Sequence, residues 1–110
     1  MPGKYAGFIM SDSYQKNFTQ ILDEFKSGDK SKAFKKQENY LKNNPNDNVA
    51  RFNFAIMCNE TNKDDLAIKN YKQVIRNDKS HWESRFNLYI IYLDKKLYEE
   101  AHQYVNEVLE

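Results

Sequence analysis

The 110-residue chain lacks the features that mark secreted and membrane proteins. A single cysteine, Cys58, excludes an internal disulfide, so the fold does not depend on an oxidising compartment. No apolar run approaches the roughly 20 residues of a membrane-spanning helix. The start of the sequence carries a lysine, but its apolar stretch is too short for a signal peptide. We therefore expect a cytoplasmic protein that does not enter a membrane.

A strong charge of either sign is also missing. The 17 basic and 16 acidic residues leave a formal net charge of +1, which gives no long-range attraction for nucleic acid or an anionic membrane. Lysines are concentrated between positions 26 and 42, where we expect the solvated face of a helix; a patch for an acidic partner is the alternative. These lysines are Lys26, Lys30, Lys32, Lys35, Lys36 and Lys42.

Motifs of catalysis are absent from the sequence as well. There is no glycine-rich phosphate loop, no nucleophile motif and no recognisable pair of carboxylates. Glu99 and His102 stand one helical turn apart, but two potential ligands without a third do not form a metal site. We expect Cys58 to lie in the core. The sequence therefore predicts that the protein is not an enzyme and uses no metal or cofactor.

What the sequence does contain is an internal repeat. Ala33, Ala67 and Ala101 follow one another at equal intervals. The segment Arg-Phe-Asn-Phe at 51–54 recurs at the same interval as Arg-Phe-Asn-Leu at 85–88. A period of about 34 residues is typical of helix–turn–helix arrays, in which each unit buries its apolar face against its neighbours. Each alanine is also followed at the same distance by an apolar pair, namely Tyr40-Leu41, Val74-Ile75 and Val108-Leu109.

Apolar residues at helical spacing predict two helices in each unit, and no segment alternates as a strand would. Gly28 stands where a left-handed cap would end the first helix, and Pro45 ends the second. Asp47 or Asn48 is a candidate cap for the third helix. The expected helices cover about residues 13–26, 30–42, 48–60 and 81–93. A fourth helix is expected to start at Asp64 or Asp65 and to be closed by residues 77–80, and a sixth follows the turn at 94–96.

These residues resemble the tetratricopeptide repeat (TPR) family. The leucine and small residue of the family's first helix are matched by Phe54-Ala55 and Leu88-Tyr89, with Cys58 and Tyr92 at the aromatic place that follows. Pro45 matches the family's proline. In the second helices, Tyr98 matches the aromatic residue before the alanine, and Tyr71 and Val105 match the bulky residue after it.

The resemblance covers nearly the whole chain as three repeats, at 13–47, 48–81 and 82–110. Residues 1–12 are left as an N-terminal extension, with disorder as one option. The first repeat is in phase only if its turn lacks one residue. Lys79 replaces the second proline, and Tyr89 replaces a small residue. The resemblance implies an all-α fold, a right-handed superhelix of three hairpins.

The resemblance also implies a concave groove lined by the first helix of each hairpin. Phe52 and Phe86 would supply aromatic anchors, and Asn53 and Asn87 would supply amides for a peptide backbone. Packing alone is the alternative role for these residues. The expected peptide-binding residues are Val49, Phe52, Asn53, Ile56, Phe86, Asn87 and Ile90.

The expected function is therefore that of a protein-interaction scaffold, which binds a peptide or helix of an unidentified protein partner in this groove. The family normally adds a capping helix after the last repeat, whereas Glu110 ends this sequence inside its sixth predicted helix. Two alternatives follow: a fragment of a larger TPR protein, or a homo-oligomer that associates through its uncapped end. The expected self-association residues are Tyr89, Tyr104, Val105 and Val108.

Overall fold

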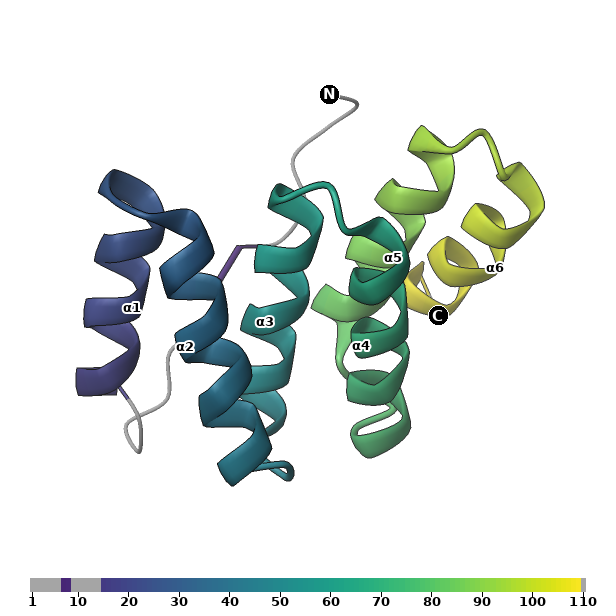
Figure 1. Ribbon diagram of the computed structural model, residues 1–110. Helices are drawn as coiled ribbons and strands as arrows, with labels where there is room; N and C mark the ends of the chain where they lie inside the picture. Colours follow the sequence, from purple (N-terminus) through teal and green to yellow (C-terminus); the bar gives the residue numbers. More distant parts are fainter. Residues whose placement is uncertain (1–6, 9–14, 110) are drawn as a thin grey trace.

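The computed structural model describes residues 7–8 and 15–109, and for residues 15–17 and 105–109 it describes the backbone alone. Within this part of the chain the secondary structure consists of six α-helices without a strand, which confirms the all-α prediction (Figure 1). The helices are α1 (Gln15–Ser27), α2 (Lys30–Asn43), α3 (Asn48–Glu60), α4 (Asp64–Asn77), α5 (Trp82–Asp94) and α6 (Tyr98–Leu109).

The helices pack mainly against their neighbours in the sequence. Contacts are most extensive within the pairs α3–α4 and α5–α6, followed by α1–α2. The pairs are joined by smaller contacts between α2 and α3 and between α4 and α5. Figure 1 accordingly shows an array that runs from α1 at one end to α6 at the other, and the molecule measures 37 × 26 × 19 Å.

The interior is divided into two apolar clusters. One extends from α1 and α2 to α3 and includes Phe18, Phe25 and Met57, whereas the other joins α3 to α6. The three alanines that define the repeat, Ala33, Ala67 and Ala101, are all fully buried. Each lies on the second helix of its pair, where a small side chain allows the two helices to approach closely. The interval of the sequence repeat therefore corresponds to a packing contact that recurs in each helix pair.

Two of the helix–helix turns share the same backbone geometry. Asn62 and Lys96, which occupy equivalent positions of successive repeats, both have a φ of 62°. After each of them an N–H reaches back to a carbonyl of the preceding helix: Lys63 to Cys58 at 2.8 Å, and Leu97 to Tyr92 at 2.9 Å. This is the hydrogen bond of a helix that ends in a left-handed residue.

The first turn differs from the other two. Only Gly28 and Asp29 separate α1 from α2, whereas three residues separate α3 from α4 and α5 from α6. This confirms the prediction that the first turn lacks one residue. The prediction of a left-handed cap at Gly28 is wrong, because its φ lies outside that region. The shorter turn instead starts α2 with Asp29, whose carboxylate accepts from the N–H of Lys32 at 3.1 Å.

Candidate functional site

A phenylalanine from outside the six helices packs against the array. Phe8 is partly buried and contacts both apolar clusters, while its neighbour Gly7 is exposed. The Phe8 ring meets those of Phe18 and Phe25 edge-on, with centroids 5.6 and 6.2 Å apart. Figure 1 shows residues 7–8 as a short purple segment between α2 and α3 in that view. An aromatic side chain of a non-helical segment therefore already occupies a surface of the helices.

The two rings under Phe8 belong to one face of α1. Phe18 and Phe25 lie two helical turns apart, and their exposed fractions are 0% and 1%. Met57 of α3 is buried in the same cluster. Because Phe8 also touches the cluster that joins α3 to α6, it lies where the two clusters meet. We call this contact surface the Phe8 site.

The energetics of the Phe8 site are close to balance. Full burial of a phenylalanine side chain is worth about 1.5–3 kcal/mol, and Phe8 is only partly buried. Edge-to-face ring pairs add roughly 0.5–1.5 kcal/mol. Ordering the backbone costs about 1–2 kcal/mol for each residue. For the two described residues, Gly7 and Phe8, the gain from the ring and the cost of ordering the backbone are therefore similar in size.

Four of the seven residues expected to line a peptide groove have little or no exposed surface. The exposed fractions of Phe52, Asn53 and Asn87 are 0%, and that of Ile56 is 1%. The Phe52 ring packs 5.8 Å from that of Tyr71 on α4 and 4.9 Å from His81 before α5. The amide of Asn87 donates to the hydroxyl of Tyr71 at 3.2 Å. Phe52 and Asn87 therefore join α3, α4 and α5.

Of the other three expected groove residues, Ile90 is also buried, and two lie nearer the surface. Val49 and Phe86 are partly buried, and Ile90 is 6% exposed. The Phe86 ring lies 6.4 Å from that of Tyr89 on the same helix. Phe52 and Phe86 occupy equivalent positions of successive repeats, yet Phe52 is fully buried and Phe86 is partly exposed. Phe86 is therefore the aromatic residue of this set that a partner can reach.

The expected self-association residues are described only in part. Tyr89 and Tyr104 are partly buried, and Tyr104 stacks on Tyr92 with centroids 5.8 Å apart. Burial is the main cause of the raised pKa of Tyr104. The side chains of Val105 and Val108 lie outside the described residues.

Large apolar side chains are nevertheless exposed at both ends of the third hairpin. Trp82 begins α5 and is 54% exposed, whereas Leu97, just before α6, and Tyr98, its first residue, are 42% and 54% exposed. The 13 residues of α5 separate the two places by about 20 Å. These side chains therefore do not form one continuous patch.

The six lysines between positions 26 and 42 are all exposed, as the prediction of a solvated helix face requires. Lys36 and Lys32 contact the carboxylate of Glu24 on α1 at 2.9 and 3.4 Å. The hydrogen bond from Lys36 lowers the pKa of Glu24 below its ordinary value. The ammonium of Lys30 lies 4.1 Å from the centroid of the Phe25 ring. Three of the six lysines thus interact with α1 rather than forming an unbroken basic surface.

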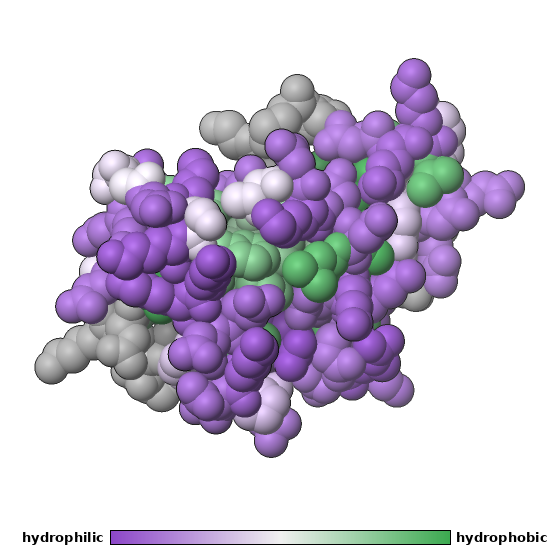
Figure 2. Space-filling view, in the orientation of Figure 1, coloured by the Kyte–Doolittle hydropathy of each residue, from purple (hydrophilic) through white to green (hydrophobic). Residues whose placement is uncertain are grey.

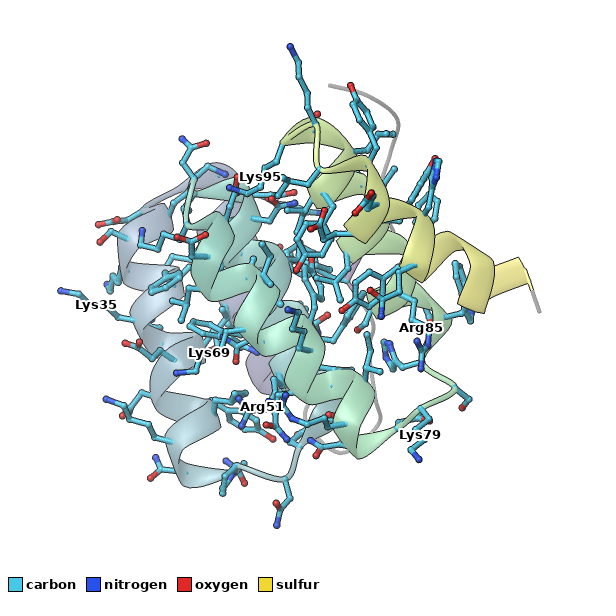
Figure 3. The ribbon with its side chains drawn as sticks, turned by 90° about the vertical axis from the view of Figure 1, so that its right-hand side faces the viewer. Lys35, Arg51, Lys69, Lys79, Arg85 and Lys95 are labelled. Atoms are coloured by element: carbon cyan, nitrogen blue, oxygen red, sulfur yellow. The ribbon has the colours of Figure 1, made fainter. Side chains whose placement is uncertain are left out.

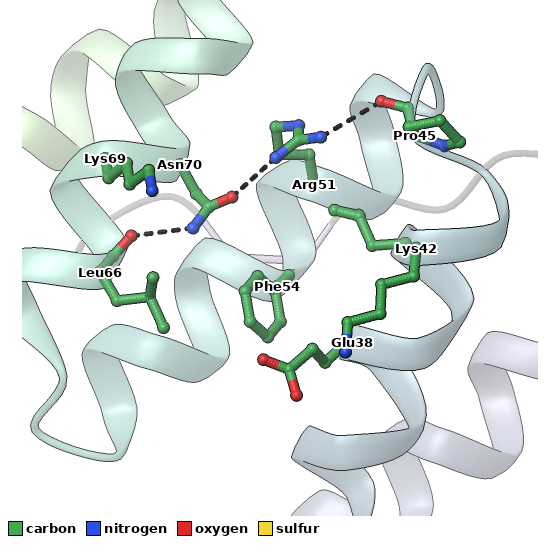
Figure 4. Close-up of a pocket in the computed structure, with 9 residues that line it drawn as sticks. Glu38, Lys42, Pro45, Arg51, Phe54, Leu66, Lys69 and Asn70 are labelled. Atoms are coloured by element: carbon green, nitrogen blue, oxygen red, sulfur yellow. Dashed lines mark hydrogen bonds between the residues drawn. The ribbon is translucent and has the colours of Figure 1, made fainter.

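A shallow pocket of about 310 Å³ lies between α2 and α4 (Figure 4). Arg51 crosses it, donating to the side-chain oxygen of Asn70 at 2.9 Å and to the carbonyl of Pro45 at 3.2 Å. Burial lowers the pKa of Arg51. The amide of Asn70 donates in turn to the carbonyl of Leu66 at 2.9 Å. Arg51 therefore connects α3 to α4 and to the turn that precedes α3.

The face of the molecule seen in Figure 1 is mainly hydrophilic, with small hydrophobic areas near its centre and at its upper right (Figure 2). Figure 3 shows the basic side chains of Lys35, Arg51, Lys69, Lys79, Arg85 and Lys95 spread over several helices and turns rather than gathered at one point.

The described residues offer no constellation for metal binding or for thiol chemistry. Within residues 7–8 and 15–109, no three His, Cys, Asp or Glu side chains are grouped so that they could hold a metal ion. Cys58 is buried as expected, and this burial raises its pKa to about 12, which keeps the thiol protonated and unreactive. In the same part of the chain, each helix is too short or too polar to cross a membrane.

Sequence reasoning missed the Phe8 site, because residues 1–9 fit no position of the repeat. The signal that was present in the sequence is the apolar pair Phe8-Ile9, which precedes the first predicted helix. Comparison with known proteins adds no assignment: no family model matches the chain, and neither a curated protein nor a solved structure matches it.

Proposed function

We propose that this chain is a TPR domain, a right-handed solenoid of three helical hairpins that serves as a protein-interaction scaffold. The proposal is supported by contacts that recur at the interval of the sequence repeat. Asn62 and Lys96 share a left-handed backbone, and the three repeat alanines are fully buried. Solenoids of this kind present extended surfaces that receive segments of other proteins.

The observation that carries the binding function is the contact of Phe8 with the helices. A side chain on a non-helical segment packs edge-on against Phe18 and Phe25 and reaches both clusters. This contact supports a role of the surface in receiving an aromatic residue on a non-helical segment of chain. The partner we propose is a peptide segment that places one aromatic side chain in the Phe8 site and continues towards Phe86 on α5.

The experiment is to select ligands from a random peptide display library and to measure their dissociation constants by calorimetry. We expect the selected peptides to contain an aromatic residue. Phe86→Ala should weaken their binding at least ten-fold. Tyr98→Ala is the matched control: it removes an exposed aromatic side chain at the start of α6 and should leave the affinity unchanged. Equal effects of both variants, or selection of no peptide, would contradict the proposal.

Self-association is a second candidate function, favoured by the exposure of Trp82 and Tyr98. Burial of such rings against a second copy would remove apolar surface from water at both ends of the third hairpin. Light scattering during size-exclusion chromatography tests this candidate over a range of concentrations. A dimer that dissociates on Trp82→Ala supports it, and a monomer at high concentration rejects it.

A further inference from the structure

We infer that Phe8 is a displaceable occupant of the Phe8 site, so that a partner's aromatic residue must compete with the protein's own N-terminal segment. This inference rests on the proposed function, because it concerns the same peptide-binding surface. It adds a mechanism of regulation: the surface is closed while Phe8 is docked and opens when Phe8 leaves. The partner it predicts is an extended segment with an aromatic side chain of similar size.

The burial pattern separates Phe8 from the core on which it rests. Phe18 and Phe25 have almost no exposed surface, whereas Phe8 is partly exposed and Gly7 is exposed. A Cβ atom added to Gly7 would have no heavy atom within 4 Å. Of the two described residues of this segment, Phe8 is the one whose side chain packs against the helices. Because Phe8 rests on rings that belong to α1, its ring can leave the surface without unpacking the helices below it.

The geometry of the contact explains why the competitor should be aromatic. The Phe8 ring makes angles of 62° and 85° with the rings of Phe18 and Phe25. In this arrangement the positive edge of one ring faces the negative face of another. An aliphatic side chain can fill the same volume, but it lacks this electrostatic complementarity. A partner with Phe or Tyr at the docking position should therefore displace Phe8 more readily than one with Leu.

The tether explains why the closed state can compete with a free peptide. Phe8 is connected to α1 through the few residues that precede Gln15. A ligand on a short tether has an effective concentration of the order of millimolar. The apparent affinity for a peptide added in solution is reduced by the fraction of molecules in which the site is closed. Removal of the Phe8 ring should therefore increase the affinity for an external aromatic peptide.

The test uses the full chain and a fluorescein-labelled peptide with the sequence of residues 4–12. We measure binding by fluorescence anisotropy to the wild-type protein and to the Phe8→Ala protein. The Phe8→Ala protein should bind the peptide at least ten-fold more tightly than the wild type does. A peptide with alanine in place of phenylalanine should bind neither protein. Gly7→Ala is the matched control, because its added methyl group meets open space, and this protein should behave as the wild type.

Three results would overturn the inference. The first is equal affinity of the wild-type and Phe8→Ala proteins for the peptide, and the second is absence of binding to both. The third is loss of cooperative unfolding in Phe8→Ala, which would make Phe8 a permanent part of the core. Peptides from the display library separate this inference from the proposed function. If they bind the wild type and Phe8→Ala equally well, the scaffold function stands and the competition by Phe8 is rejected.

Discussion

The guanidinium of Arg85 donates two hydrogen bonds, at 3.1 and 2.9 Å, to the backbone carbonyl of Lys79. One repeat earlier in the chain, Arg51 makes the equivalent contact with the carbonyl of Pro45, at 3.2 Å. In each case the arginine lies on the first helix of a hairpin and holds the turn that leads into it. The same contact forms with Pro45 and with Lys79, so it does not require proline.

Replacement of Arg85 by methionine should therefore destabilise the protein. Loss of a hydrogen bond with an ionised donor at a solvent-exposed carbonyl should cost about 1 kcal/mol. For a chain of this size, that corresponds to a fall in melting temperature of roughly 4–8 °C. Arg76→Met is the control, because Arg76 donates to Gln73 on its own exposed helix face and holds no turn. Thermal unfolding followed by circular dichroism measures both, and equal effects would exclude the turn contact as the cause.

Phe52→Ala should reduce stability far more than Phe86→Ala. Phe52 is fully buried between Tyr71 and His81, and truncation of a buried phenylalanine typically costs about 3–5 kcal/mol. Phe86 is partly exposed, so its truncation leaves a smaller cavity. The free energy of unfolding, measured in urea, should show this order. Equal losses for the two variants would mean that the rings have similar environments.

Lys96→Gly should stabilise the protein by up to about 1 kcal/mol. Lys96 has a φ of 62°, and this left-handed backbone costs a residue with a side chain about 1–2 kcal/mol. Glycine avoids this cost, although the greater freedom of the unfolded chain offsets part of the gain. Lys95→Gly is the matched control, because Lys95 has a φ of −80° and should lose stability on the same change. Urea unfolding measures both variants, and a loss of stability in both would contradict the argument.

Cys58 should make the protein less stable at alkaline pH. Burial raises the pKa of the folded thiol to about 12, from an ordinary value of 9.0. Above pH 9 the unfolded chain loses this proton while the folded chain keeps it, so the free energy of unfolding falls as the pH rises from about 9 to about 12. Cys58→Ala should remove that part of the pH dependence. Urea unfolding between pH 7 and about 10.5 compares the two proteins, and parallel curves would reject the assignment.

The helices could be predicted because their apolar spacing and their end signals are local. The third helix was expected at 48–60, and the structure has Asn48–Glu60. The N-cap at Asp47 was also a candidate, and its carboxylate accepts from the N–H of Ala50 at 3.0 Å. His81 was expected inside the fifth helix but caps it instead, because its ring nitrogen Nδ1 accepts from the N–H of Ser84 at 3.3 Å. Histidine in this role carries no sequence signal.

The exposure of the candidate site could not be predicted in the same way. Phe52 and Phe86 occupy equivalent positions, so the repeat gives them the same expected role. His81, from the connection to the next hairpin, covers Phe52, whereas the ring beside Phe86 belongs to its own helix. The exposed fraction of such a side chain therefore depends on the neighbouring hairpin as well as on its position within its own hairpin. The docking of Phe8 depends on a contact between a segment outside the repeat and helices that follow it.

The restriction of contacts to neighbouring helices has a consequence for how the chain folds and opens. Contacts that are local in sequence close short loops, and proteins dominated by them fold rapidly. The middle hairpin, α3–α4, has packed neighbours on both sides, whereas α1–α2 and α5–α6 each have one. Local opening should therefore begin at the two ends, and the slowest amide hydrogen exchange should be found in α3 and α4. A ligand that bridges α1 and α3 would slow exchange at the first end while leaving the far end unchanged.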